Sequence, residues 1–169
     1  LTMSETTDSK CWTNKNKNQE KFEKKWGKKW IPPKSPYNLI QEQLWEDPWK
    51  IFVACIFCNL TKRVDAEPFI WEFLKKYPTP QEASVANIRT LQEMIHPLGL
   101  SERRSKALVL MSDGYLRKRW RDNPTVLYGI GKYASDAYRI FCIGDWKNVQ
   151  PKDHALNDYH DFLKTRFAS

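Results

Sequence analysis

The chain has 169 residues, with 28 Lys or Arg against 20 Asp or Glu, so its formal net charge is +8. This length suits one domain of roughly 100–200 residues, and a hydrophobic content of 41% excludes a disordered chain. The longest apolar run, residues 51–57, is far shorter than the roughly 20 residues that span a membrane, so we expect no membrane partner. The positive charge makes a polyanion the first partner to test, but charge alone does not identify one.

The first 29 residues differ in composition from the rest of the chain. Eight lysines against four acidic residues give them half of the net charge, and few apolar side chains accompany them. We expect residues 1–29 to form a basic, flexible tail and residues 30–169 to form the folded domain. The tail is either a solvated extension or a basic arm that follows phosphates.

From residue 30 onward, capping signals and apolar periodicity predict helices joined by short turns. Asp47-Pro48 is typical of a helix start, and it opens an almost wholly apolar helix that we expect at the centre of the fold. No pattern typical of strands or hairpins occurs, so the sequence predicts a compact all-α domain. The expected helices begin near Tyr37 and span 48–59, 64–77, a short stretch after Thr79, 86–95, 101–120, 133–143 and 153–165.

The most informative local motif is a Gly-x-Gly turn at residues 127–134. Gly129 and Gly131 allow a tight backbone whose amide N–H groups can point at a phosphate oxygen at the start of the next helix, where Lys132 lies. A Gly-x-Gly turn alone is a weak signal. Its weight comes from Asp153, which lies 22 residues after Gly131 at another predicted helix start.

These motifs resemble the helix-hairpin-helix superfamily of base-excision DNA glycosylases. The similarity is greatest to the branch whose members also carry a methyl-CpG-binding domain and act on thymine or uracil in G:T and G:U mismatches. It extends with few gaps from Trp30 to about Phe167. The matching stretches are residues 32–42, 47–50, 97–100, 129–133, 138–142 and 153–161. The resemblance implies the helical fold of that superfamily, here without an iron-sulfur cluster, because no cysteine follows Cys142.

The resemblance also implies roles for three residues of an active site. Asp153 matches the essential aspartate, which stabilises the cationic sugar and orients or deprotonates the attacking water. Tyr133 matches the position where relatives with lyase activity carry a lysine nucleophile, so hydrolysis without lyase activity is expected. Gln41 matches a pocket residue that hydrogen-bonds the extracted pyrimidine. For Asp153, helix capping alone is the structural alternative.

Two further segments are expected to contact the DNA. Leu98 and Leu100 match a loop that enters the minor groove, and Leu100 is the better candidate for the apolar wedge because Leu98 could equally face the core. Leu60 departs from the family, which has an arginine there that helps to fill the gap left by the flipped nucleotide. The gap is then filled by Leu60 or by a nearby cation, or extrusion is weaker. Basic residues follow the loop at positions 103, 104 and 106.

The sequence therefore predicts a monofunctional, mismatch-specific DNA glycosylase that flips thymine or uracil opposite guanine, in a CpG context, for base excision repair. We expect double-stranded DNA as partner, a monomer, a nuclear location and no metal or cofactor, with room for a monovalent cation at the hairpin. Cys55-x-x-Cys58 is interpreted as core packing and not as a zinc site. The alternatives are a non-catalytic helix-hairpin-helix DNA-binding module and a basic RNA-binding or scaffold protein.

Overall fold

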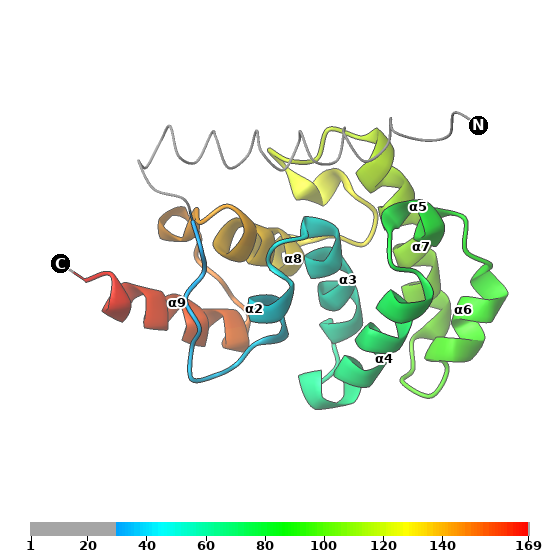
Figure 1. Ribbon diagram of the computed structural model, residues 1–169, viewed down its shortest axis with the longest axis horizontal. Helices are drawn as coiled ribbons and strands as arrows, with labels where there is room; N and C mark the ends of the chain where they lie inside the picture. Colours follow the sequence, from blue (N-terminus) through cyan, green and yellow to red (C-terminus); the bar gives the residue numbers. More distant parts are fainter. Residues whose placement is uncertain (1–29, 169) are drawn as a thin grey trace, which may run out of the picture.

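The computed structural model describes residues 30–168, and the predicted tail at residues 1–29 lies outside the described residues. This part of the chain contains helices and turns and no strand, so the predicted all-α class is confirmed. None of its helices combines the length and apolar character needed to cross a membrane. In chain order (Figure 1), the elements are α2 (Ile40–Leu44), α3 (Pro48–Cys58), α4 (Arg63–Lys76), α5 (Pro80–Ser84), α6 (Ile88–Ile95), α7 (Ser101–Arg117), the 3-10 turn η1 (Pro124–Val126), α8 (Lys132–Ala137), the π-helical turn η2 (Tyr138–Cys142), the 3-10 turn η3 (Trp146–Asn148) and α9 (His154–Arg166).

Helix α3 is the buried centre of the molecule, as predicted. Its start is fixed by Asp47, whose side chain accepts a hydrogen bond from the Trp49 amide at 3.0 Å, with Pro48 at the first helical position. Residues 51–57 are all buried, and α3 packs against α2, α4, α7, α8 and η2. In Figure 1, α2, α8 and α9 lie on one side of α3, and α4 to α7 lie on the other. A helix that is apolar all round needs such enclosure.

Aromatic side chains fill much of the space around α3. Phe52 packs edge-to-face against Trp120 at a ring-centroid distance of 5.4 Å, and Trp120 packs in the same way against Tyr138. Trp49, also on α3, lies 6.2 Å from Phe73 of α4. These contacts join the central helix to the segment after α7, to η2 and to α4.

Several predicted helix limits are wrong, each for a local reason. The first helix begins at Ile40 and not near Tyr37, because Asn38 has a left-handed backbone (φ 47°). The long helix predicted at residues 101–120 begins at Ser101 as α7. The same helix ends at Arg117, because Lys118 is extended and the chain turns back to bury Trp120.

The predicted helix at residues 133–143 is in fact two elements. It begins as α8 and widens into the π-helical turn η2 at Tyr138. Such turns insert one residue into a helix and are not signalled by apolar periodicity. The buried Tyr138 and Phe141 are both placed by this turn, so the widening directs two aromatic side chains into the core.

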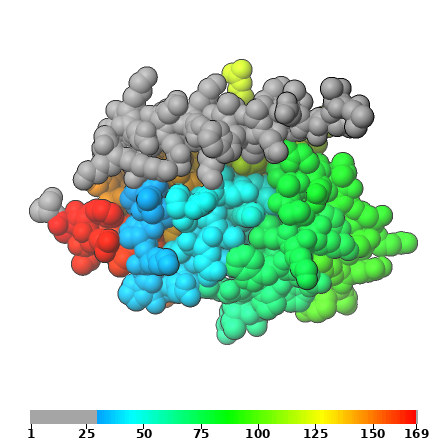
Figure 2. Space-filling model, in the orientation of Figure 1, coloured from blue at the N-terminus to red at the C-terminus, as the bar shows by residue number. Residues whose placement is uncertain are grey.

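The proline-rich segment before α2 lies against the C-terminal helix. Tyr159 on α9 donates a hydrogen bond to the carbonyl oxygen of Pro33 at 2.7 Å, and the rings of Trp30 and Phe167 are 6.2 Å apart. Figure 2 shows this blue segment directly beside the red C-terminal residues. The two ends of the described chain therefore pack together, and the segment before α2 is joined to the middle and the C-terminal end of α9.

Candidate active site

Gln41 and Tyr133, which are 92 positions apart in the sequence, meet across the interior. The Gln41 side chain is only 4% exposed, and its Nε2 donates a hydrogen bond to the Tyr133 hydroxyl at 3.0 Å. Gln41 comes from α2 and Tyr133 from the first turn of α8. Both predicted pocket residues therefore belong to one polar cluster, and burial of these groups is favourable only with such pairing.

The placement of Gln41 depends on its neighbour Glu42. The Glu42 carboxylate accepts hydrogen bonds from the backbone amide of Leu39 and from the backbone amide and hydroxyl of Ser35, each at 2.7 Å. These bonds satisfy amide groups at the start of α2 and attach the proline-rich segment to it. They fix the short helix and therefore the direction of Gln41.

Asp153 lies at the N-cap of α9, as predicted from the sequence. Its Oδ2 accepts a hydrogen bond from the Leu156 amide at 3.0 Å, and the side chain is half-buried. Burial raises the pKa of the Tyr133 phenol above its ordinary value, and the nearby Cys55, Cys58 and Asp153 raise it further. Asp153 is thus close enough to act electrostatically on the Gln41–Tyr133 pair, and Tyr133 stays a neutral phenol at physiological pH.

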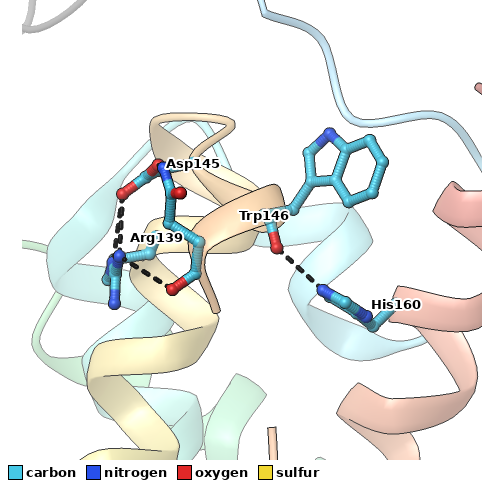
Figure 3. Close-up of polar contacts among 5 residues, drawn as sticks. Arg139, Asp145, Trp146 and His160 are labelled. Atoms are coloured by element: carbon cyan, nitrogen blue, oxygen red, sulfur yellow. Dashed lines mark hydrogen bonds and ion pairs between the residues drawn. The ribbon is translucent and has the colours of Figure 1, made fainter. Parts of the chain in front are cut away.

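The loop that leads to Asp153 is held by two sets of polar contacts, drawn in Figure 3. Arg139 forms an ion pair with Asp145 at 2.9 Å, which closes the turn after η2. The His160 ring on α9 hydrogen-bonds the carbonyl oxygen of Trp146 at 2.7 Å. Because His160 is on the helix that Asp153 caps, this bond fixes α9 relative to the loop.

Cys55, which the sequence predicts only as a core residue, also belongs to the polar cluster. Cys55 is 2% exposed, so the core interpretation is correct, and Gln41 and Tyr133 beside it partly offset the rise in its pKa. Burial raises its pKa, and burial raises the pKa of Cys58 to about 11. No sequence signal separates such a thiol from an ordinary buried cysteine, which behaves as a small apolar residue.

The Gly-x-Gly turn has the tight backbone that the sequence predicts. Gly129 has φ 75°, and a Cβ atom there would lie 3.0 Å from the Cβ of Ala107, so only glycine fits. Gly131 is exposed, and a Cβ there would meet no atom within 4 Å. The Lys132 amine is in an ion pair with Asp136 at 2.5 Å, which partly neutralises the one cation of the motif.

The two loops with leucine candidates present them differently. Leu98 is half-buried and packs against the core, whereas Leu100 is 47% exposed with a left-handed backbone (φ 50°). Leu60 also has a left-handed backbone (φ 61°) and is 77% exposed. Leucine rarely adopts this conformation. Among the exposed large apolar residues of the described chain, these two combine exposure with a left-handed backbone.

The basic residues at the start of α7 divide between surface and interior. Arg103 is exposed, and the Lys106 amine lies 5.5 Å from the centre of the exposed Tyr128 ring. Arg104 is buried and is therefore unavailable to phosphates. A small pocket joins this helix end to the loops and the hairpin, and it is lined by Ile56, Asn59, Leu100, Arg103, Arg104, Ala107 and Gly129.

Gln41 and Tyr133 are in direct contact, and Asp153 is near enough for its charge to help raise the pKa of Tyr133. Leu100 and Gly129 line the small pocket. Within residues 30–168, no group of three or more His, Cys, Asp or Glu side chains could hold a metal ion. A half-buried carboxylate beside a neutral phenol and an amide can stabilise positive charge, position water and hydrogen-bond a planar ligand.

Comparison with known proteins reveals several relatives, although no protein-family model matches the chain. The chain is 40% identical over 137 residues to a methyl-CpG-binding domain protein 4-like protein of Arabidopsis thaliana; the match covers 81% of this chain and 31% of that protein. It is 28% identical over 104 residues to a thymine/uracil-DNA glycosylase of Pyrobaculum aerophilum and 35% identical over 104 residues to a thymine-DNA glycosylase of Aeropyrum pernix. Those two matches cover 58% and 57% of this chain, and 45% and 46% of the relatives.

The solved structures give a match in fold. A trapped covalent intermediate of endonuclease III with DNA superposes with a TM-score of 0.52 at 13% identity, over 76% of this chain and 59% of that one. Because the identity is low, this likeness bears on the fold alone. The chain spans about a third of the length of the plant relative and under half of the two archaeal ones.

Proposed function

We propose that the chain is a DNA glycosylase of the helix-hairpin-helix superfamily and that it hydrolyses the N-glycosidic bond of thymine or uracil opposite guanine in double-stranded DNA. The proposal includes a preference for CpG sites. It is supported by the names of the relatives and, within the chain, by the Gln41–Tyr133 hydrogen bond and the charge of Asp153, which helps to raise the pKa of Tyr133. The Gln41–Tyr133 contact is the observation that carries the proposal.

Each of the three side chains has a role in this reaction. The Nε2 of Gln41 is bound to the Tyr133 hydroxyl, so its carbonyl oxygen is the group that accepts the N3–H of an extracted pyrimidine. The Tyr133 ring forms a wall beside the base. The Asp153 carboxylate stabilises the oxocarbenium ion that develops as the base leaves, and it orients the water that attacks the sugar.

Hydrolysis by water, without lyase activity, follows from the residue at position 133. A lyase needs an amine that attacks the sugar carbon to form a Schiff base. Tyr133 has none, and burial keeps its phenol neutral by raising the pKa. The neighbouring Lys132 amine is held by Asp136. The product on this proposal is an abasic site in an intact strand.

A non-catalytic DNA-binding module is the second candidate. It is favoured by Leu60, which replaces a gap-filling arginine, and by the capping bond of Asp153 to Leu156, which gives the aspartate a purely structural use. Both candidates bind DNA through the hairpin. Only the glycosylase changes the DNA.

The test is a single-turnover assay on labelled duplexes with one G:T, G:U or A:T pair, followed by alkali to cleave abasic sites. We expect alkali-dependent cleavage at G:T and G:U only, and more in CpG context. Asp153→Asn removes the charge but keeps a good N-cap residue, so folding and binding persist while turnover is lost. Asp161→Asn, on the exposed face of the same helix, is the matched control. Binding without cleavage by the wild type would favour the module.

The remaining assignments are part of the same proposal. We propose that the protein acts as a monomer in the nucleus, binds DNA through the hairpin at Gly129, Gly131 and Lys132, and needs no metal or organic cofactor. A monovalent cation at the hairpin is compatible with it. Added chelator should leave the cleavage rate unchanged, and a rate that rises with added zinc or magnesium would contradict the absence of a metal.

A further inference from the structure

Leu60 and Leu100 lie on separate loops but share an unusual combination of properties. Each is exposed, at 77% and 47%, and each has a left-handed backbone, with φ of 61° and 50°. Asn59, next to Leu60, lines the same small pocket as Leu100, so the two loops are neighbours. An isolated loop would relax such a backbone, so surrounding contacts must hold it.

Arg104 supplies those contacts to both loops. Its Nη1 donates to the carbonyl oxygen of Gly99 at 2.7 Å, in the loop of Leu100. Its Nη2 donates to the carbonyl oxygens of Phe57 and Asn59, at 3.1 and 3.0 Å, and to the Thr61 hydroxyl, in the loop of Leu60. One guanidinium thus holds the residues on both sides of Leu60 and the residue before Leu100.

This guanidinium is placed at considerable cost to the fold. Arg104 is 3% exposed, its Nε has no hydrogen-bond partner, and no acidic side chain of residues 30–168 pairs with it. A buried charge satisfied only by carbonyl and hydroxyl oxygens is less stable than an apolar side chain of similar volume in many folds. Its value therefore lies in fixing geometry, because five donors in a rigid plane define where the acceptors sit.

We propose that Arg104 is a positioning residue that sets the spacing of Leu60 and Leu100, so that the two leucines enter a base step as one two-pronged apolar probe. The inference rests on the proposed function, since it assigns the pair to extrusion of the target nucleotide. Apolar side chains inserted between base steps unstack them. Two prongs held at a fixed distance do so without first being ordered, which lowers the entropic cost of insertion.

The test separates extrusion from chemistry. Wild type, Arg104→Met, Arg104→Lys and Leu60→Ala are assayed in single turnover on a G:U duplex and on a duplex whose uracil is already extrahelical in a bulge. We expect Arg104→Met to lose about 10- to 100-fold on the paired uracil, the scale of a small misplacement, and to stay within about twofold of wild type on the bulge. Arg104→Lys, which cannot reach both loops as a fork, should recover only part of the loss.

Two controls exclude a merely structural role. Ile70→Ala, at a fully buried position of α4, provides a destabilised variant that should lose activity equally on both substrates, if at all. Leu60→Ala should slow the wild type on the paired uracil but have no further effect in Arg104→Met, since the probe is already misplaced. Equal losses of Arg104→Met on both substrates, or additive losses with Leu60→Ala, would overturn the inference.

A fluorescence readout keeps this inference distinct from the proposed function. The duplex carries 2-aminopurine beside the mismatch, and binding of the Asp153→Asn variant should raise its fluorescence as the base step unstacks. The double variant, with Arg104→Met as well, should bind without this rise. A wild type that raises emission but never cleaves would refute glycosylase activity and leave the probe intact. A wild type that cleaves, with a fluorescence rise that Arg104→Met leaves unchanged, would refute the probe alone. If the wild type gave no cleavage and no fluorescence rise, both proposals would be refuted.

Discussion

The polar cluster around Gln41 and the pair of loops around Arg104 are built in opposite ways. In the cluster, the Gln41 amide and the Tyr133 phenol satisfy each other, Asp153 accepts a bond from its own helix, and on the proposed function these side chains act on the substrate. In the loops, the buried arginine contacts only backbone and a hydroxyl, and the working parts are the exposed leucines. On the proposed function, polar groups thus serve chemistry in one region and geometry in the other.

Removing the Gln41 amide from the polar cluster should lower turnover more than any other change that follows. Gln41→Ala deletes the acceptor for the base and the donor to Tyr133, so we expect turnover on G:T to fall on the order of 100-fold, as when one positioned hydrogen-bonding group is lost. Gln43→Ala, at an exposed position of the same helix, is the control. Single-turnover rates measure both. Equal rates for Gln41→Ala and wild type would place the base elsewhere.

The hairpin glycines should separate stability from DNA contact. Gly129→Ala adds a Cβ 3.0 Å from Ala107 at a positive φ, so we expect a loss of about 1–3 kcal/mol in the free energy of unfolding. Gly131→Ala meets no atom and has an ordinary backbone, so stability should change by less than about 0.5 kcal/mol while DNA affinity falls. Denaturant titration and duplex binding give the two numbers. Loss of stability in Gly131→Ala with intact binding would reverse the assignment.

The neighbouring leucines should divide in the same manner. Leu98→Ala opens a half-buried contact with the core, so we expect about 1–2 kcal/mol of destabilisation with little change in turnover well below the unfolding transition. Leu100→Ala is exposed and should slow cleavage of paired uracil without measurable destabilisation. Thermal unfolding and single-turnover rates test the pair, and the opposite pattern would make Leu98 the wedge.

The thiols of α3 predict a small loss of stability at alkaline pH. Burial raises the pKa of Cys58 from 9.0 to about 11, so between these values the unfolded chain releases a proton that the folded chain keeps. The contribution of these thiols to the free energy of unfolding is therefore constant below about pH 9 and falls above it, with a limiting slope of about 1.4 kcal/mol per pH unit for each such group. Cys58→Ala should make the slope shallower between pH 9 and 10, and an unchanged slope would contradict the burial effect.

The sequence predicts best those features that depend on local rules. The start of α3 follows from Asp47-Pro48, and the cap of α9 follows from Asp153, because both need only adjacent residues. The all-α class follows from periodicity along the chain. Gln41 and Tyr133 were found only through resemblance, since nothing local joins residues that are 92 positions apart.

The remaining features depend on contacts that a single sequence does not encode visibly. Arg104 is one of several basic residues at a helix start, and only packing distinguishes this buried positioning residue from its exposed neighbour Arg103. Cys55 is indistinguishable from a core thiol until Tyr133 is placed against it. The left-handed backbone at Leu60 and Leu100 is likewise imposed from outside, because leucine has no intrinsic preference for it.

The central claim is that Asp153 serves chemistry as well as helix capping, and one measurement tests it most directly. Wild type and Asp153→Asn are compared on a G:T duplex for binding, unfolding and alkali-dependent cleavage, with Asp161→Asn alongside. We predict equal affinity and stability for all three proteins, and cleavage by wild type and Asp161→Asn only. Cleavage by Asp153→Asn at the wild-type rate would contradict the account.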